Sequence, residues 1–226
     1  MSYGLKVEVW GSYALFTRPE LKVERMTYEM MTPSAARGLI ESIYWHPGLQ
    51  IKIDRIYLLP PMGSDDRDKD PIRFDSIRRN EINKKGSIKA MKKMMEGGPE
   101  EYIAASQQRV QRAALVLRDV HYVIAAHFEL TDKANPSDNE GKFADIFRRR
   151  LEKGQMYSQP YLGTREFPAH FQAWKELEIP TVHVTRDLGL MLYDMDYSNL
   201  KDIVPMFFHA ELKDGVMEVS GKEIYK

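Results

Sequence analysis

The sequence predicts an α+β fold, because strand-like and helix-like hydrophobic patterns follow one another along the chain. Apolar and polar residues alternate at 5–10, 51–59 and 119–130, which is typical of half-buried strands. Apolar residues recur three and four positions apart at 34–44 and 143–151, which is typical of amphipathic helices. The rest of the chain, after the second helix, has strand patterns joined by short turns.

The first helix carries boundary signals at both ends. Thr32 is a suitable N-cap, and Pro33 suits the first helical turn. Pro47 and Gly48 follow as residues that end a helix. One stripe of this helix is apolar, and the side chains opposite that stripe are Arg37, Glu41 and Tyr44.

The order of the elements predicts how the chain is divided. Strand, helix and strand, followed by another strand and helix, resemble a split βαβ unit of the ferredoxin-like kind. Asp214-Gly215 predicts a hairpin turn in the strand-rich tail. We therefore expect a ferredoxin-like domain at 1–155 and a small β-rich C-terminal region at 156–226.

Composition excludes several classes of protein. The 226 residues include 33 Lys+Arg and 33 Asp+Glu, so the net charge of zero argues against a wholly basic nucleic-acid coat and against an acidic tail. The absence of cysteine excludes disulfide scaffolds, thiolate nucleophiles and Cys-based metal sites. No apolar run approaches the roughly 18 residues of a membrane span. We expect a cytoplasmic protein that makes no membrane contact.

Motifs for metals and nucleotide cofactors are absent. The P-loop, dinucleotide and HExxH patterns do not occur. His121 and His127 share a strand face but lie six residues apart, which is about 20 Å in a strand. The aspartates at 65–70 favour a solvated loop over a cation site. The sequence therefore predicts neither a metal nor a cofactor.

Positive charge is concentrated locally in spite of the neutral total. Between 73 and 93, basic residues outnumber acidic ones by eight (Arg73, Arg78, Arg79, Lys84, Lys85, Lys89, Lys92 and Lys93) to two (Asp75 and Glu81). A second basic cluster is Arg148 to Arg150. Such segments are either solvated surface or contacts for phosphates, and nearby Phe74 and Tyr102 suit stacking on RNA bases. Duplex DNA is an alternative partner for the basic segment.

Two further residues are candidates for chemistry from their positions alone. Tyr44, near the end of the first helix, is either packed at an interface or a hydroxyl that serves a site. His127, opposite the apolar face of its strand, is either a hydrogen-bonded structural residue or a group that meets a ligand.

Several long blocks resemble one protein family over nearly the whole chain. The blocks are VEVWGSYALFTRPELKVERMTYEMMTPSAARGLIESIYWHP at 7–47, IRFDSIRRNEI at 72–82, QRAALVLRDVHYVIAAHFEL at 111–130, YLGTREFPAHF at 161–171 and DLGLMLYDMDY at 187–197. They are similar to the CRISPR-associated proteins of the fifth Cas family, type I-C (Dvulg) subtype, within the repeat-associated RNA-binding (RAMP) superfamily. The resemblance implies an RRM-type, ferredoxin-like domain followed by a small β-rich extension.

The resemblance also implies an activity and partners. Type I-C members are metal-independent endoribonucleases that cleave CRISPR precursor RNA within each repeat. They then stay on the 5′ handle of the guide RNA as a subunit of the type I-C interference complex. An alternative is a non-catalytic subunit that binds the 5′ end of the guide while another ribonuclease processes the transcript.

Site residues follow from the matching blocks. The family's catalytic tyrosine matches Tyr44, in the context IESIYW, and its histidine matches His127. The lysine that precedes that histidine in the family is replaced by Ala126, which favours the non-catalytic alternative. The RNA-contacting candidates, some of which could supply the missing positive charge, are Arg37, His46, Arg78, Arg79 and Arg165.

Overall fold

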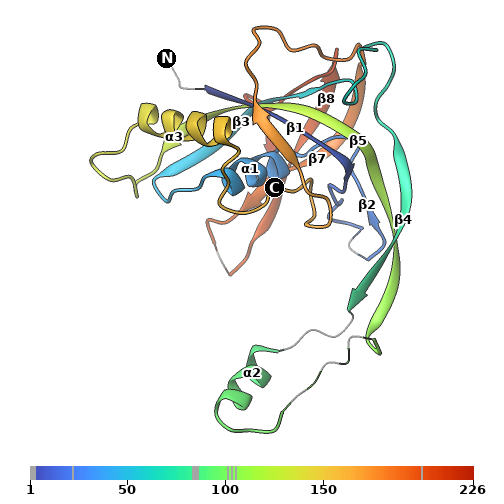
Figure 1. Ribbon diagram of the computed structural model, residues 1–226, viewed down its shortest axis with the longest axis vertical. Helices are drawn as coiled ribbons and strands as arrows, with labels where there is room; N and C mark the ends of the chain where they lie inside the picture. Colours follow the sequence, from blue (N-terminus) through green and yellow to red (C-terminus); the bar gives the residue numbers. More distant parts are fainter. Residues whose placement is uncertain are drawn as a thin grey trace.

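A mostly antiparallel sheet forms the centre of this mixed α/β protein, and two helices, α1 and α3, pack against it (Figure 1). The computed structural model describes residues 4–21, 23–82, 87–100, 102, 104, 106–199 and 201–226. The helices in these residues are α1 (Pro33–Ile43), α2 (Ile88–Met95) and α3 (Glu140–Lys153). None of the described helices is long and apolar enough to cross a membrane.

The strands of the described residues join in one ten-stranded sheet. They are β1 (Gly4–Ala14), β2 (Arg25–Met26), β3 (Leu49–Leu58), β4 (Phe74–Ile82), β5 (Arg109–Leu130), β6 (His170–Ala173), β7 (Arg186–Asp196), β8 (Val204–Lys213), β9 (Val216–Glu218) and β10 (Ile224–Tyr225). Strands therefore occur where apolar and polar residues alternate, and helices occur where apolar residues recur three and four positions apart.

The long strand β5 connects the parts of the sheet. Its second half pairs antiparallel with β1 on one side and β3 on the other, and β6 pairs antiparallel with the far side of β1. Its first half pairs antiparallel with β4. The C-terminal strands join the same sheet, since β9 pairs with β3 and β8 pairs with β9, β7 and β10.

The two body helices pack their apolar faces on the sheet, and their ends follow local signals. The Thr32 side chain accepts a hydrogen bond from the Ala35 N–H, which confirms the predicted N-cap of α1. The predicted extent was one residue too long, because α1 ends at Ile43 and Tyr44 is its C-cap in extended conformation. In α3, Phe143, Phe147 and Leu151 are buried, as their spacing predicts.

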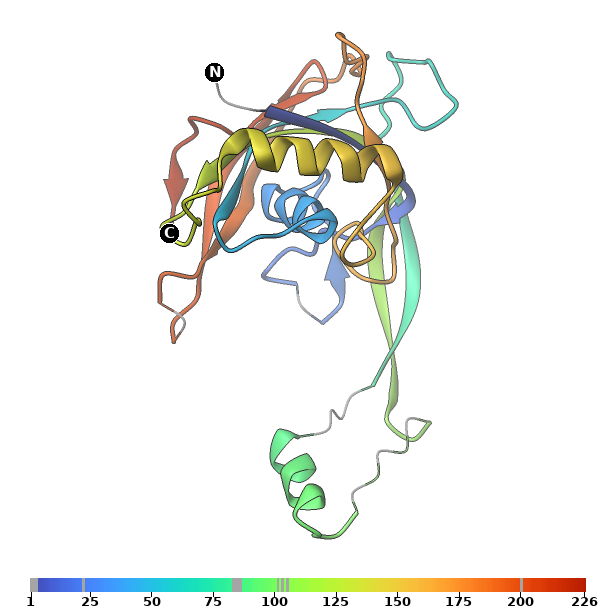
Figure 2. The same ribbon diagram turned by 60° about the vertical axis from the view of Figure 1, so that its left-hand side comes forward.

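The β4–β5 hairpin extends away from the body as an arm and carries α2 beyond its end (Figure 2). Side chains along β4 alternate between exposed and half-buried, so neither of its faces packs fully in the core. The predicted basic segment 73–93 lies along this arm, although its Lys84 and Lys85 fall outside the described residues.

Left-handed backbone, with positive φ, is important at two of the turns. Asp214 and Gly215 have φ of 47° and 73°, as a tight turn between β8 and β9 demands, which confirms the predicted hairpin. Gly163 has φ of 85°, and a Cβ at this position would lie 2.1 Å from the Leu15 carbonyl oxygen. The segment around Gly163 therefore approaches the end of β1 more closely than any side chain allows.

Gly163→Ala is expected to lower the free energy of unfolding by about 2 kcal/mol or more, because left-handed strain and the clash with Leu15 act together. Urea denaturation followed by circular dichroism measures the loss. Gly63→Ala is the matched control, since Gly63 has φ of 80° with nothing within 4 Å of the added Cβ. Equal losses in the two variants would show that the approach to Leu15 contributes nothing.

Candidate active site

Tyr44 lies just past the end of α1, where the chain turns away from the helix. Its N–H donates to the Ile40 carbonyl oxygen, and its half-buried ring packs against Phe143 and Phe147 of α3, with centroid separations of 6.3 and 5.5 Å. Among the described residues, the Tyr44 hydroxyl has no hydrogen-bond partner. The ring is therefore fixed by packing while its polar atom stays available.

Donors from later in the chain satisfy the last carbonyl groups of α1. Arg150 Nη1 donates to the Ile43 oxygen over 2.6 Å, and the N–H groups of Tyr157 and Ser158 donate to the Ser42 oxygen over 2.9 and 3.0 Å. The Arg150 guanidinium also lies 5.0 Å from the centroid of the Tyr44 ring. A cation here interacts favourably with the negative end of the helix dipole and with the π face of the ring.

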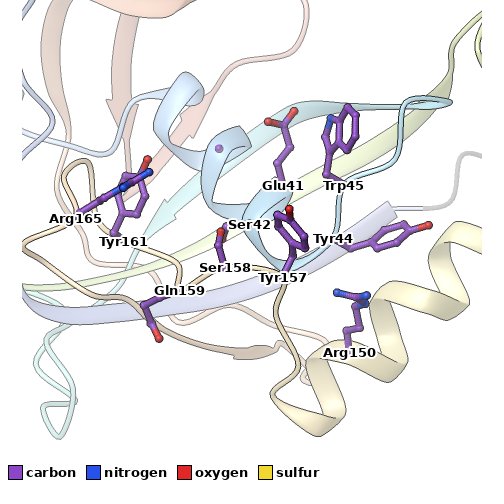
Figure 3. Close-up of a pocket in the computed structure, with 11 residues that line it drawn as sticks. Glu41, Ser42, Tyr44, Trp45, Arg150, Tyr157, Ser158, Gln159, Tyr161 and Arg165 are labelled. Atoms are coloured by element: carbon purple, nitrogen blue, oxygen red, sulfur yellow. The ribbon is translucent and has the colours of Figure 1, made fainter. Parts of the chain in front are cut away.

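These contacts surround a cleft of about 840 Å³ between α1, α3 and the segment that follows α3 (Figure 3). Tyr44 and Arg150 line one side of it, and the predicted RNA contact Arg165 lines another. The aromatic side chains that line the cleft besides Tyr44 are Trp45, Tyr157 and Tyr161. The cleft thus combines aromatic rings, hydroxyl groups and guanidinium groups.

The electrostatic balance of this cleft is positive. Arg150 and Arg165 form no ion pair with a carboxylate of the described residues. Glu41, also on the wall, accepts two hydrogen bonds from Arg37, which it shares with Asp194, so the cleft lining has one carboxylate against two arginines that have no carboxylate partner. The cleft therefore offers two cations to an anionic ligand.

His127 lies on the other face of β5 and does not contact Tyr44. Its neighbour Phe128 stacks on Phe147 at 5.0 Å, on the side where Tyr44 lies. Successive side chains of a strand point to opposite faces, so His127 points away from that side. Its Nδ1 lies 2.8 Å from an Asp54 oxygen and its Nε2 lies 3.7 Å from a Glu129 oxygen.

The partners of His127 define its orientation. A carboxylate accepts hydrogen bonds, so Asp54 holds the hydrogen on Nδ1. The His127 side chain is 27% exposed, and Nε2 is then the nitrogen that remains for other groups. Ala126, in place of the lysine that the family resemblance implies, is buried on the Phe128 side. The structure therefore does not bring the two predicted catalytic residues together.

Arg37 is committed to internal contacts. Its guanidinium donates to both oxygens of Asp194 and to both oxygens of Glu41. Burial alone would lower the pKa of Arg37, but the two carboxylates outweigh it and raise the pKa above its usual range. This predicted RNA contact instead links α1 to β7.

His46 lies near Tyr44 but is also engaged. The Gly48 N–H donates to its Nδ1 over 3.1 Å, and its ring packs against Phe143 with centroids 5.3 Å apart. An Nδ1 that accepts this hydrogen bond carries no hydrogen, so the 3.9 Å separation from Asp138 is not a charged pair in that state. His46 shapes the loop between α1 and β3.

The neighbouring arginines of the arm have different surroundings. Arg79 is 10% exposed and forms ion pairs with Glu81 and Glu166. Burial opposes ionisation of Glu166, but the hydrogen bonds from Arg79, Thr164 and the backbone, together with the charge of Arg79, outweigh it, so the pKa of Glu166 lies below its usual value. Arg78 is exposed and has no ion-pair partner among the described residues. Of the two, Arg78 is free to contact a ligand.

The predicted acidic loop at 65–70 is mostly exposed, and two of its carboxylates are used within the protein. Asp68 contacts His183 at 2.7 Å, and Asp70 accepts from Arg186 at 2.6 Å. Across the part of the chain that the structure describes, no group of three or more His, Cys, Asp or Glu side chains could hold a metal ion.

The sequence indicated Arg150 only as part of the basic cluster at 148–150, and it gave no indication of Tyr157 as a site residue. Arg150 comes three residues after Phe147 and seven after Phe143, which places it on the face of α3 that meets Tyr44. That spacing was the available signal. Tyr157 follows the helix and gave no periodic signal, because its place depends on the backbone contact with Ser42.

Known sequences are similar to this chain over nearly its full length. A family model of the Cas5d type, described as "CRISPR-associated protein (Cas_Cas5)", matches residues 4–220. A protein of Mannheimia succiniciproducens named "CRISPR pre-crRNA endoribonuclease Cas5d" is 42% identical, over 97% of this chain and 96% of its own. A protein of the same name from Thermus thermophilus is 36% identical, over 98% of this chain and 95% of its own.

A comparison with solved structures supports the fold. A crystal structure titled "Crystal Structure of CRISPR-associated Protein" superposes with a TM-score of 0.68 at 20% identity, covering 99% of this chain and 96% of the other. The arrangement of sheet and helices therefore occurs in another CRISPR-associated protein.

Arg150→Ala is expected to lower the free energy of unfolding by about 1–3 kcal/mol, because the Ile43 carbonyl group at the end of α1 loses its donor. Urea denaturation measures this change. Arg149→Ala is the control, since Arg149 is exposed on the same helix. An Arg150 variant as stable as the Arg149 variant would contradict the capping role.

Proposed function

The chain belongs to the CRISPR-associated Cas5d family, and from this membership we propose that it is an endoribonuclease that cleaves CRISPR precursor RNA within the repeat. The observation that carries the proposal in the structure is the unpartnered Tyr44 hydroxyl on the wall of a cleft with two uncompensated arginines. Such a cleft can hold a phosphodiester beside a group that positions or transfers a proton.

The reaction requires no water. The 2′-oxygen of one ribose forms a bond to the adjacent phosphorus, and the bond from that phosphorus to the 5′-oxygen of the next nucleotide breaks. The 2′-hydroxyl loses its proton, and the leaving 5′-oxygen gains one. A cation stabilises the extra negative charge on the phosphoryl oxygens as the bonds exchange.

The residues of the cleft and of β5 divide these tasks. Tyr44 is the positioning or proton-transfer hydroxyl, and Arg150 beside it supplies positive charge where Ala126 supplies none. His127 is the general acid or base, oriented by Asp54. Because His127 and Tyr44 lie on opposite sides of β5, one RNA that meets both must pass around the end of the sheet.

We also propose a fold unit, a cellular compartment and a complex for this enzyme. The strand order β6-β1-β5-β3 with antiparallel neighbours supports a ferredoxin-like, RRM-type unit, completed by β6. The division into 1–155 and 156–226 stays a prediction, as do residence in the cytoplasm, independence of metal and contact with duplex DNA. We also propose that the protein keeps the 5′ handle of the guide RNA and joins the type I-C interference complex.

One observation favours a second function. Tyr44 and His127 lie apart, and Ala126, the residue before His127, is buried. This arrangement suits a subunit that binds the 5′ end of a guide without cleaving it. Cleavage of repeat RNA by the purified protein in the presence of EDTA separates the two functions, because only the endoribonuclease cleaves.

Tyr44→Phe combined with His127→Ala is expected to abolish cleavage of labelled repeat RNA in EDTA, while the Kd for that RNA stays within about tenfold. The physical reason is that the double variant loses a hydroxyl and an imidazole that act in proton transfer, a step worth roughly 10²–10⁴-fold per group. Single-turnover cleavage followed by gel electrophoresis measures the rate.

The single variants test each residue separately, since the two lie on different faces. Tyr225→Phe and His209→Ala are matched controls, because these residues lie on the C-terminal strands outside the cleft. Full cleavage by the double variant would remove both residues from the mechanism, and full cleavage by one single variant would remove that residue alone.

Arg78→Ala is expected to weaken RNA binding and to reduce the slope of log K against log salt by about 0.7, the contribution of one phosphate contact to a single strand. Arg79→Ala is expected to leave that slope unchanged and to lower the free energy of unfolding, because Glu166 loses its partner. Fluorescence anisotropy at several salt concentrations and urea denaturation measure the two effects. A reduced slope for Arg79→Ala would contradict this assignment.

A further inference from the structure

Exposed aromatic rings gather at one place on the surface. Trp45 is 60% exposed, Tyr157 is 84% exposed and Tyr161 is 38% exposed, and all three line the cleft beside Tyr44. Figure 3 shows Trp45 and Tyr157 near Tyr44 at the end of α1, and Tyr161 beside Arg165. Large aromatic side chains grouped in a cleft expose apolar surface that a ligand can cover.

The backbone that carries Trp45 and Tyr157 is anchored at the end of α1. Tyr157 follows α3, and its N–H is fixed by the Ser42 oxygen. Trp45 follows the C-cap of α1 directly. Both rings therefore project from chain segments whose position is set by the end of one helix, so little backbone order has to be gained when a ligand binds.

The charge of the cleft indicates which ligand fits. Arg150 and Arg165 are uncompensated by carboxylates of the described chain, while Glu41 is bound by Arg37. A ligand that presents flat π faces to the rings and negative groups to the guanidiniums matches this pattern. Single-stranded RNA does so, because its bases stack on aromatic side chains and its phosphates bind cations.

Trp45 lies at the border of two hollows. Trp45 borders the cleft and also a second hollow of about 640 Å³ between α1, β3 and β7. The two aspartates of that hollow, Asp194 and Asp196, are bound by Arg37 and Lys226. Lys52 there is ion-paired with Glu129, and the side chains that can meet bases or phosphates are Lys133, Tyr193 and Tyr197. An RNA strand can therefore cross Trp45 from one hollow to the other.

We propose that Trp45 and Tyr157 form a stacking platform for single-stranded RNA, with Arg150 and Arg165 contacting its phosphates. The platform binds the strand next to Tyr44 and thereby determines which nucleotides reach that hydroxyl. This inference rests on the proposed function, since it names the residues that hold the same RNA.

Binding of repeat RNA with a 2′-O-methyl group on every nucleotide tests the platform, because this RNA lacks the attacking hydroxyl and cannot be cleaved. By fluorescence anisotropy, Trp45→Ala is expected to raise the Kd about tenfold or more, as the loss of a stacked base does. Trp45→Phe keeps a ring and is expected to stay within about threefold. Tyr157→Leu is expected to behave like Trp45→Ala.

Tyr225→Leu is the matched control, since Tyr225 is 42% exposed on β10 and lines neither hollow. Unchanged Kd values of Trp45→Ala and Tyr157→Leu for the RNA would overturn the platform. The platform would also be overturned if these variants lost affinity for a protein partner but not for the RNA. Cleavage by the wild-type protein is scored separately with unmodified RNA. Failure of that cleavage would remove the proposed function and leave the binding result standing.

Discussion

The end of α1 is the constraint on which the candidate site depends. A helix leaves its last carbonyl groups without partners inside the helix, and here those of Ser42 and Ile43 receive hydrogen bonds from Ser158, Tyr157 and Arg150. The Arg150 contact spans 107 residues of sequence. The cleft therefore forms only when α3 and the segment after it have docked on α1. The need of the last α1 carbonyl groups for hydrogen-bond donors thus determines the surroundings of Tyr44.

The sheet imposes a second constraint, because β5 carries His127 and Phe128 on opposite faces. Phe128 joins the apolar layer with Phe147 that supports Tyr44, whereas His127 joins Asp54 and Glu129. A strand cannot present adjacent residues to one side without a bulge. Chemistry that involves both Tyr44 and His127 thus depends on the path of the RNA as much as on the protein.

Much of the fold follows from periodicity and end signals, as the Thr32 cap, the buried face of α3 and the Asp214-Gly215 turn illustrate. The site was less predictable because it depends on contacts between distant residues. Arg37 and Asp194 are 157 positions apart, so no local pattern could tell that this arginine is used internally. Arg79, paired with Glu166, is a similar case. Family resemblance identified Tyr44 and His127 but not their separation.

The neutral net charge gains a physical meaning from these pairings. Acidic residues that neutralise Arg37 and Arg79 leave Arg78, Arg150 and Arg165 as cations without carboxylate partners in the described chain. A protein with zero net charge gains little from long-range nonspecific attraction to nucleic acid, since that attraction grows with the number of phosphates contacted. Its selectivity must then come from stacking and from hydrogen bonds at short range. A cleft that places aromatic rings beside two arginines meets that requirement where a broadly basic surface would not.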